Sequence, residues 1–516
     1  MRGPASLALC ASLVTLVPAV CLAGWNVDGV TVTSTTDNIP LVAACGDGAG
    51  GTFVAWQQES APGAGVLRVQ HLTATGDFGY PWPEAGAVAC SVSTARTNLV
   101  ALPDHLGGAY LSWMEGGSLR LTRVLGTGAI AAGWPARGRV VAQASTYSGA
   151  LPPRACEDSG GGVYLAWVGT SALVSAIHLG PNNTGAGGWP NSPRTVGSID
   201  PTVDFDIWPQ VALAGDGGAF IAWGSFTYDS TLEPGNFRLR HVTSSGLNEA
   251  SWPDEGLDFG VLDPAVLGHA MRASLLALAP DATGGAYMLR GLPSVGADLV
   301  NTLFRLAPDG SSAADWPAEG RNVGGPYYYD GSDQGLSYRL HSDGIGGAIA
   351  GMPSYASDYG STMQFQDQRT AGVAWWMETP LTSMIDLDSK GDGGAFAAAC
   401  IPDGPFNMWA PPASIEVDQV LGSWGYYVEY HPEPAQHWYG DIALAVTGDG
   451  EAVFFWSQEN QKYGLFARKF SSAGQVTAAP AGSPDPGVLS DVRFERGIGV
   501  RATVRLDAGE RGRLAL

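Results

Sequence analysis

Short apolar runs recur along the whole chain, and each is bounded by residues typical of turns, above all Gly, Asp and Pro. Many runs are apolar at nearly every position, as in AFIAW at 219–223. No segment keeps the three-to-four-residue apolar spacing of an amphipathic helix. Runs of this kind predict β-strands. Because they do not alternate between apolar and polar residues, both faces of these strands should be covered.

Eight times along the chain, a Gly-rich turn that carries an Asp is followed directly by one of these apolar strands. The first two copies are GDGAGGTFVAW (46–56) and DHLGGAYLSW (104–113). The others lie at 158–167, 214–223, 281–290, 343–352, 390–399 and 447–456. The Asp stands nine residues before the end of the motif in five copies, but seven before it in the copies with Asp216, Asp392 and Asp449. We therefore expect a turn two residues shorter in those three copies.

A second element, built around Trp-Pro, alternates with the first. Its clear copies lie at 80–86, 133–138, 188–192, 251–256 and 315–320, and looser ones surround Trp375-Trp376 and Trp424. A short strand precedes each clear copy, such as RLRHV at 238–242. One period of about 55 residues therefore holds four strands: one before the Asp turn, one after it, one before the Trp-Pro element and one after it.

Four-stranded units that repeat without linkers and are covered on both faces predict an all-β fold, a β-propeller of about eight blades. The segment 24–35 has the form of a fourth strand with no unit before it, and the last unit lacks its own fourth strand. The N-terminal strand is therefore expected to complete the last blade and to close the ring, which would hide an exposed sheet edge.

The two ends of the chain differ from the repeats. Residues 1–23 have the positive start, apolar middle and small residues of a secretory signal peptide. We expect the propeller over 24–475, a linker over 476–487 and a short β tail over 488–516. No later run reaches the ~18 apolar residues of a membrane span. The predicted location is extracellular or at the cell surface, with the periplasm as the alternative.

Charge and cysteine content narrow the possible partners. The formal net charge of -22 disfavours nucleic acid and anionic membranes, which attract basic surfaces. Four cysteines remain after the predicted signal: Cys45, Cys90, Cys156 and Cys400. The sequence permits free buried thiols or one disulfide, for which Cys45–Cys90 is the expected pair because both residues fall within one repeat.

The repeated ionisable residues are interpreted as architecture. Asp and Gly suit the tight turn itself, and a calcium site would need several carboxylates in one loop. His71, His178 and His241 share a third-strand position at which other units have Arg123 or Arg305, and we expect this position to pair with the turn Asp or a neighbouring blade. The His and Glu residues at 429–437 lack the spacing of a known metal motif. No metal and no cofactor are predicted.

Candidate ligand-binding residues lie in long, aromatic insertions at 224–237, 321–335, 352–363, 401–414 and 423–440, which strand direction places on the end of the propeller opposite the Asp turns. They are Tyr328, Tyr329, Asp330, Tyr359, Trp409, Tyr427, Tyr430, Trp438 and Tyr439. Aromatic rings among polar groups suit an extracellular glycan or protein, so we expect a non-catalytic binding module. One alternative is a glycoside hydrolase or lyase that uses Asp330, Asp358 or Glu429. The others are a structural envelope or matrix protein and aromatics that only pack the loops.

The DGxGGxxxAW and GWPxxG repeats resemble those of secreted bacterial proteins predicted to be β-propellers, over residues 24–475. The Asp turn is also similar to the Asp-box hairpin of sialidase-like propellers. The chain has no Arg-Ile-Pro segment of the sialidase kind, so the resemblance implies a fold and no catalytic residues. The tail resembles a truncated sorting domain of type IX secretion or a flagellar-hook Ig-like module.

Overall fold

The computed structural model describes residue 25 and residues 29–143, 154–169, 172–199, 205–226, 235–262, 276–293, 298–328, 338–356, 360–369, 372–380, 384–402, 412–421, 424–430, 438–459, 464–470, 492–495 and 501–504. The chain divides into two compact units. One is Trp25–Thr477, and the other combines Met1–Gly24 with Ala478–Leu516. The described part of the latter is a hairpin of β33 (Val492–Glu495) and β34 (Arg501–Val504).

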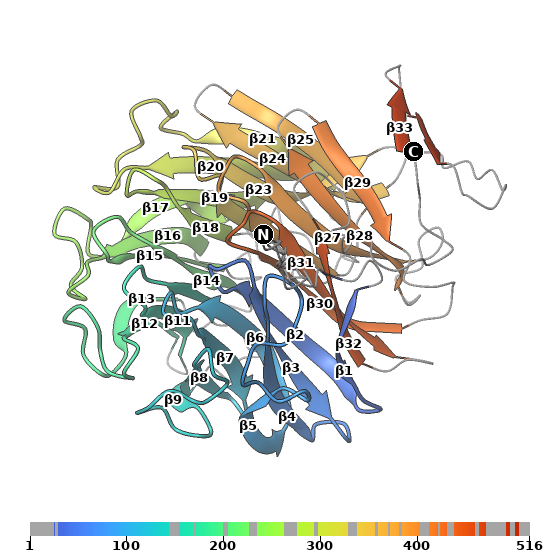
Figure 1. The fold of residues 1–516 in the computed structure, drawn as a ribbon. Coiled ribbons are helices and arrows are strands. Elements are labelled where there is room, and N and C mark those ends of the chain that lie inside the picture. The colour runs from blue at the N-terminus through green and yellow to red at the C-terminus, as the bar shows by residue number, and fades with distance from the viewer. Residues whose placement is uncertain are drawn as a thin grey trace, which may run out of the picture. The chain divides into compact units, whose positions relative to one another are not determined.

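The unit Trp25–Thr477 consists of eight four-stranded antiparallel sheets, and this confirms the predicted β-propeller (Figure 1). Blades 1 to 4 are β2 (Asn38–Gly46), β3 (Thr52–Glu59), β4 (Gly65–Leu72), β5 (Ala87–Thr94); β6 (Arg96–Pro103), β7 (Ala109–Glu115), β8 (Ser118–Val124), β9 (Arg139–Gln143); β10 (Arg154–Glu157), β11 (Val163–Val168), β12 (Leu173–Leu179), β13 (Arg194–Ser198); and β14 (Phe205–Leu213), β15 (Ala219–Phe226), β16 (Gly235–Val242), β17 (Leu257–Leu262).

Blades 5 to 8 are β18 (Leu276–Pro280), β19 (Ala286–Pro293), β20 (Asp298–Leu306), β21 (Arg321–Tyr328); β22 (Arg339–Ser342), β23 (Ala348–Ala356), β24 (Gly360–Arg369), β25 (Gly372–Pro380); β26 (Met384–Ser389), β27 (Ala395–Pro402), β28 (Pro412–Leu421), β29 (Trp424–Tyr430); and β30 (Trp438–Val446), β31 (Ala452–Glu459), β32 (Gly464–Phe470) with β1 (Val30–Ser34). The first strand of each unit is the innermost strand of its blade.

The ring closes in blade 8, where strands from both ends of the unit share one sheet. β1 pairs antiparallel with β32, with Val30 opposite Ala467, and the two strands lie together in Figure 1. The innermost strands contact one another in order around the ring, and β30 contacts β2. The expected completion of the last blade by the N-terminal strand is confirmed.

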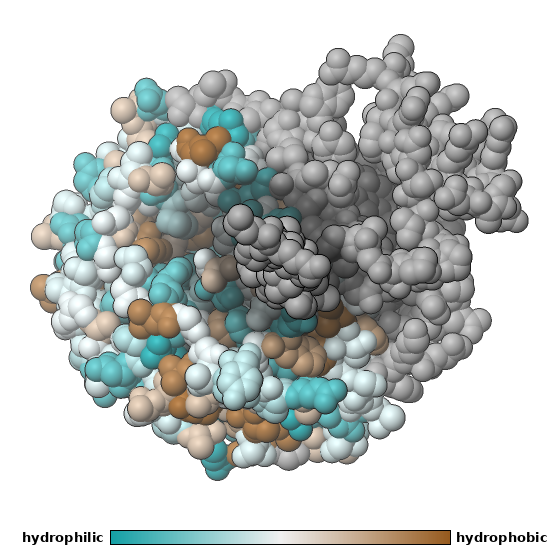
Figure 2. Space-filling view, viewed as in Figure 1, coloured by the Kyte–Doolittle hydropathy of each residue, from teal (hydrophilic) through white to brown (hydrophobic). Residues whose placement is uncertain are grey.

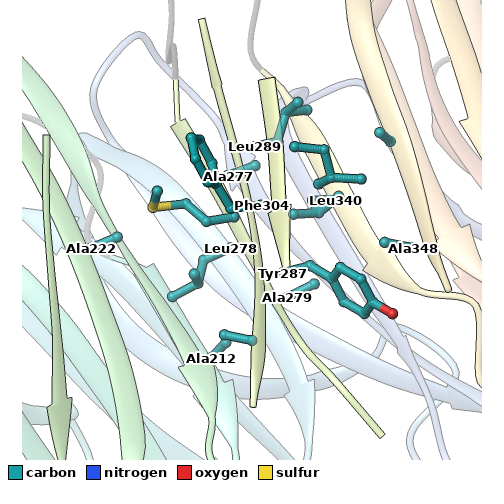
Figure 3. Close-up of a cluster of buried hydrophobic side chains, with 14 of the residues drawn as sticks. Ala212, Ala222, Ala277, Leu278, Ala279, Tyr287, Leu289, Phe304, Leu340 and Ala348 are labelled. Atoms are coloured by element: carbon teal, nitrogen blue, oxygen red, sulfur yellow. The ribbon is translucent and has the colours of Figure 1, made fainter. Parts of the chain in front are cut away.

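The apolar core lies between neighbouring blades rather than inside one layer. The second strands are covered on both faces, and every residue of β7 is buried. Figure 3 shows one such region, in which side chains from blades 4, 5 and 6 meet, among them Ala212, Tyr287 and Leu340. The expectation drawn from the unbroken apolar runs is therefore confirmed.

Each Asp turn is held by an ion pair. In blade 1 the Asp47 Oδ1 accepts hydrogen bonds from the amides of Ala49 and Gly51, and His71 contacts Oδ2 at 2.8 Å. The other pairs are Arg123–Asp104, His178–Asp158, His241–Asp216, Arg305–Asp281, Arg369–Asp343, Lys390–Asp392 and Lys469–Asp449. The expected pairing of His71, His178 and His241 with the turn Asp is confirmed.

The predicted shortening of three turns is wrong. In blade 1 the amide of Asp47 donates to the carbonyl of Gly51, and in blade 4 the amide of Ala214 donates to the carbonyl of Gly218. Both turns therefore span the same number of residues. The position of the Asp within the turn differs instead. Asp216 is the third residue of its turn, and its Oδ1 lies 3.2 Å from Nε2 of His241. Asp392 and Asp449 occupy the same third position in blades 7 and 8.

In blades 1, 2 and 4 the Trp-Pro element joins the blade to the next. The indole nitrogen of Trp82, in blade 1, donates to the carbonyl of Gly126, in blade 2, at 2.7 Å. Trp134 and Trp252 make the same contact, to Pro181 and Pro308. The turn approaches the ring closely because Gly128 has a φ of 82°, and a Cβ there would lie 3.3 Å from the Trp82 ring.

Blades 6 and 7 lack this element. In blade 6 β24 ends at Arg369 and β25 begins at Gly372, and in blade 7 β28 ends at Leu421 and β29 begins at Trp424. Trp375 therefore lies inside a strand, opposite Asp367. The looser Trp copies are strand residues because a two-residue hairpin leaves no room for a Trp-Pro loop.

Replacing Trp134 by Phe should cost about 1 kcal/mol more stability than replacing Trp189 by Phe. Both changes leave a similar space, but only Trp134 loses a hydrogen bond, the 2.9 Å bond to Pro181, while the Trp189 indole nitrogen has no partner. Thermal denaturation of both variants measures the difference. Equal losses would show that the hydrogen bond between blades contributes nothing.

Three of the four cysteines after residue 23 have described side chains, and none of the three is in a disulfide. Cys45, Cys90 and Cys156 are free thiols. The proposed Cys45–Cys90 disulfide is wrong because Cys45 lies on the innermost strand of blade 1 and Cys90 on the outermost. Three strand spacings separate them, about 14 Å, and a disulfide needs Cα atoms within about 7 Å.

Candidate functional site

The propeller has two chemically different ends. Because neighbouring strands run antiparallel, the turns between first and second strands and between third and fourth strands lie at one end, here called the turn face. The connections between second and third strands, and between blades, lie at the opposite end, here called the loop face.

The polar groups of the turn face are engaged in holding the turns. Burial works to raise the pKa of Asp47, but the hydrogen bonds from His71 and from two backbone amides outweigh it and the pKa is lowered. Asp158 shows the same balance with His178. A carboxylate with one oxygen on backbone amides and the other on a histidine side chain supports the hairpin. The prediction that the Asp of the motif stabilises a turn is confirmed for these two blades.

The predicted binding residues fall on the loop face or beyond the described chain. Tyr329, Asp330, Tyr359 and Trp409 lie outside the described residues, as do Asp358 and the two histidines at 431 and 437. The backbone is described for Tyr328, Tyr427, Tyr430, Trp438 and Tyr439.

Several of the predicted insertions are partly strand. The stretch 352–363 belongs to β23 and β24 except for its middle, and 424–430 forms β29. The long-loop prediction is wrong for these parts. Tyr and Thr are common there, and such residues extend strands readily.

Four of the candidate aromatics come to the loop face by strand direction. Tyr328 and Tyr430 are the last residues of β21 and β29, the outermost strands of blades 5 and 7. Trp438 and Tyr439 begin β30, the innermost strand of blade 8. Tyr427 differs from these four, since it lies inside β29 opposite Asp418. Blades 7 and 8 are neighbours, so Tyr430 and Trp438 flank one connection between blades.

A channel of about 1280 Å³ runs between the innermost strands of all eight blades. Most positions that line it are Ala, Val, Leu, Pro or Gly. Two carboxylates tie neighbouring strands together: Asp441 accepts from the amide of Val42 at 2.7 Å, and Asp388 accepts from the amide of Val446 at 2.8 Å. These contacts bridge blades 8 and 1 and blades 7 and 8.

Sequence reasoning missed the polar residues of this channel. His341 lies 3.9 Å from Asp388, and Arg339 precedes it on the same strand. Confinement in the channel lowers the pKa of His341, and the charge of Arg339 lowers it further. The sequence did contain a signal for these residues. At the same position of the first strand, blades 4 and 5 have the small apolar residues Ala212 and Ala279, whereas blades 6 and 7 have His341 and Asp388.

Neither metal-binding groups nor a hydrophobic patch indicates a second site among the described residues. Within the described ranges no group of three or more His, Cys, Asp or Glu side chains is arranged to hold a metal ion. No helix in the part of the chain that the structure describes has the length and hydrophobicity of a membrane span. Hydrophobic residues are scattered over the described surface in Figure 2.

No protein family matches the sequence, and no curated protein matches it. Solved structures match at low identity. The Dos1 propeller is 9% identical over 89% of this chain and 96% of its own, with a TM-score of 0.45. A polysaccharide lyase, Uly1, is 11% identical over 71% of this chain and 88% of its own, with a TM-score of 0.37. The WD40 domain of Toxoplasma gondii coronin is 10% identical over 89% and 86%, with a TM-score of 0.35. Such likenesses concern the fold, and the chain is a β-propeller of repeated four-stranded blades.

Proposed function

We propose that this protein is a secreted or cell-surface binding module that recognises an extracellular glycan or protein through aromatic residues of its loop face. The observation that carries the proposal is that Tyr328, Tyr430, Trp438 and Tyr439 all stand at strand ends on that face. None of them belongs to the repeated architecture, whereas the turn Asp residues, their cationic partners and most Trp-Pro rings are used to hold blades together.

The scaffold suits this role because strand ends on closed, packed blades are fixed in position. Aromatic rings bind the apolar faces of sugars or the side chains of a protein partner, and a rigid support keeps the entropy cost low. Export rests on the signal-like segment 1–23, which motivates the proposed location.

An array of glycans and extracellular proteins, incubated with the protein lacking residues 1–23, tests the proposal. A variant with Tyr430→Ala, Trp438→Ala and Tyr439→Ala should lose binding about tenfold or more, as for central aromatic residues in other interfaces. The matched control is Tyr80→Ala, because Tyr80 is 96% exposed and lies on the turn face. All variants should melt within a few degrees of the parent.

Each other outcome has a defined meaning. Retained binding in the triple variant, or equal loss in the Tyr80 control, would contradict recognition through the loop face. Cleavage of a spot would support the hydrolase or lyase alternative, and replacing Asp330, Asp358 and Glu429 one at a time by the amide would identify its acid. No binding to any spot would favour a structural role.

A further inference from the structure

Blade 6 departs from the repeated ion pair of the turn face. In blade 1 the partner of the turn Asp, His71, stands opposite Phe53, and the equivalent position in blade 6 is Asp367, opposite Ile349. The turn Asp of blade 6, Asp343, is kept. An acid therefore faces an acid at a position where blades 1 to 5 and blade 8 have His, Arg or Lys.

The two carboxyl groups are fully buried, with exposed side-chain fractions of 0% for both. Asp343 Oδ1 accepts hydrogen bonds from the amides of Ile345 and Gly347, at 2.8 and 2.6 Å. Neither oxygen of Asp367 has a hydrogen-bond partner. A buried acid in this position is costly to ionise unless it is fully paired.

A single arginine serves both acids. Arg369 Nε lies 3.2 Å from Asp343 Oδ2, and its Nη2 lies 2.6 Å from Asp367 Oδ2, although this second contact does not have hydrogen-bond geometry. Arg369 is 35% exposed, so water weakens its attraction for the buried acids. One positive charge cannot balance two ionised carboxylates, and the pair is balanced when it holds one proton.

Among the described residues, the neighbouring elements show no ion pair from a further cation to the two acids. From blade 5, Tyr287 donates to the carbonyl of Gly346, and Arg321 donates to the carbonyl of Arg369. From blade 7, the turn that contains Lys390 and Asp392 packs on this site through the Gly393 amide, which donates to the Asp343 carbonyl at 2.8 Å. Lys390 itself pairs with Asp392 at 3.1 Å.

We infer that the Asp343–Asp367 pair is a proton-operated latch, closed while Asp367 is protonated and loosened when it ionises. The neutral Asp367 hydroxyl can donate to Asp343, which restores the link between turn and third strand that the ion pair makes elsewhere. Ionisation replaces this link by repulsion between two buried carboxylates. The loosening should be confined to blade 6 and its contacts with blades 5 and 7.

The direction of the pH dependence follows from the folded state. Burial and then the charge of Asp343 raise the pKa of Asp367, Arg369 opposes both, and the net result is a pKa of about 7. The unfolded chain has the ordinary value of 3.8. Between these values the folded state holds a proton that the unfolded state has lost, so stability falls as pH rises from about 4 to about 7. Opening of the blade should become easier by up to about tenfold per pH unit over that range.

The latch and the proposed recognition surface lie at opposite ends of the blades, since the Asp343 turn belongs to the turn face. Blade 6 carries the connection between β23 and β24, which contains Tyr359, and it adjoins β21, which ends at Tyr328. An effect of pH on recognition would rest on the proposed function, whereas the latch itself does not.

Hydrogen exchange of the full chain at pH 5.5, 6.5 and 7.5, corrected for the intrinsic exchange rate, tests the latch. Peptides from β22 to β25 should exchange increasingly fast as pH rises, and those from β6 to β9 in blade 2 should not change. In Asp367→Asn, which mimics the neutral acid, the pH dependence of blade 6 should disappear. Asp367→His, which restores the residue of blades 1, 3 and 4, should slow exchange in blade 6 at pH 7.5.

A flat blade 6 profile in the parent protein would overturn the inference, since it would mean that Arg369 holds both acids ionised. An unchanged slope in Asp367→Asn would overturn it as well, because another group would then be responsible. Both measurements are made without a ligand, so failure of the proposed recognition leaves them interpretable.

Discussion

Removing residues 24–35 from the protein that starts at Gly24 should lower its melting temperature by well over ten degrees and should expose it to aggregation. The deletion takes away β1, the fourth strand of blade 8, and with it Trp25 and Val32, which are 3% and 1% exposed. Losing a buried Trp alone costs about 3–5 kcal/mol. Calorimetry of the protein starting at Gly24 and of the shortened protein measures the change.

The loss should exceed the sum of these side chains because two interfaces are broken. The Trp25 indole donates to the carbonyl of Ala74 in blade 1, so the segment joins blade 8 to blade 1 as the Trp-Pro elements join other blades. The deletion also leaves β32 as an unpaired edge, which can pair with another molecule.

A synthetic peptide of residues 24–35 provides the control. Added to the shortened protein, it should restore much of the melting temperature and suppress association, since the binding site on β32 is intact. A shortened protein that melts like its parent would contradict the closing role of β1. A loss that the peptide does not reverse would indicate a folding defect elsewhere.

Replacing Asp104 by Ala should be the most destabilising single change on the turn face, at about 3–5 kcal/mol. Asp104 is fully buried and receives Arg123 through two nitrogens, at 2.8 and 2.7 Å. Its other oxygen accepts the amides of Leu106 and Gly108. Removing the carboxylate leaves a guanidinium buried without its counter-charge, which is the costly way to break a buried ion pair.

Asp392→Ala is the matched control in blade 7. Asp392 is 59% exposed and pairs with the buried Lys390, so water screens the Asp392 side of the pair and its loss should cost less than the loss of the fully buried Asp104. Combining Asp104→Ala with Arg123→Met should recover part of the lost stability, because no charge is then left buried. Denaturant titration of the variants separates these costs. Equal losses for Asp104→Ala and Asp392→Ala would contradict the role of burial.

The features that could be predicted from the sequence are those that recur in most repeats. The Asp turn, the apolar second strand and the Trp-Pro element each recur often enough that their shared role decides the fold, and the orphan strand at 24–35 could then be matched to the incomplete last unit. The pairing of His71 with a turn Asp was foreseeable because Arg123 and Arg305 stand at the same position.

The errors arose where a repeat departs from the others or where spacing along the chain does not give spacing in the sheet, and the missed residues lie between units. Counting residues between Asp216 and Trp223 suggested a shorter turn, whereas the backbone keeps one turn geometry and the carboxylate moves within it. Cys45 and Cys90 are close in sequence but occupy opposite edges of a sheet. The channel residues His341 and Asp388 form a pair across two blades, which no single repeat reveals. Asp367 is an exception that only the register of β23 and β24 places opposite its partner.

The composition of blade 8 also sets an order of events during folding. Seven sheets are each made from one continuous stretch of chain, so they can form by local hairpin pairing soon after their residues become available. Blade 8 needs Val30 beside Ala467, which is the most non-local strand pairing in the molecule. Bringing these two segments together in an unfolded chain has a high entropy cost. The cost is lower once the intervening blades have formed and the ends of the chain lie closer together. Ring closure is therefore expected to be the final step, and until then the growing array must remain an open arc that presents the unpaired side of β32.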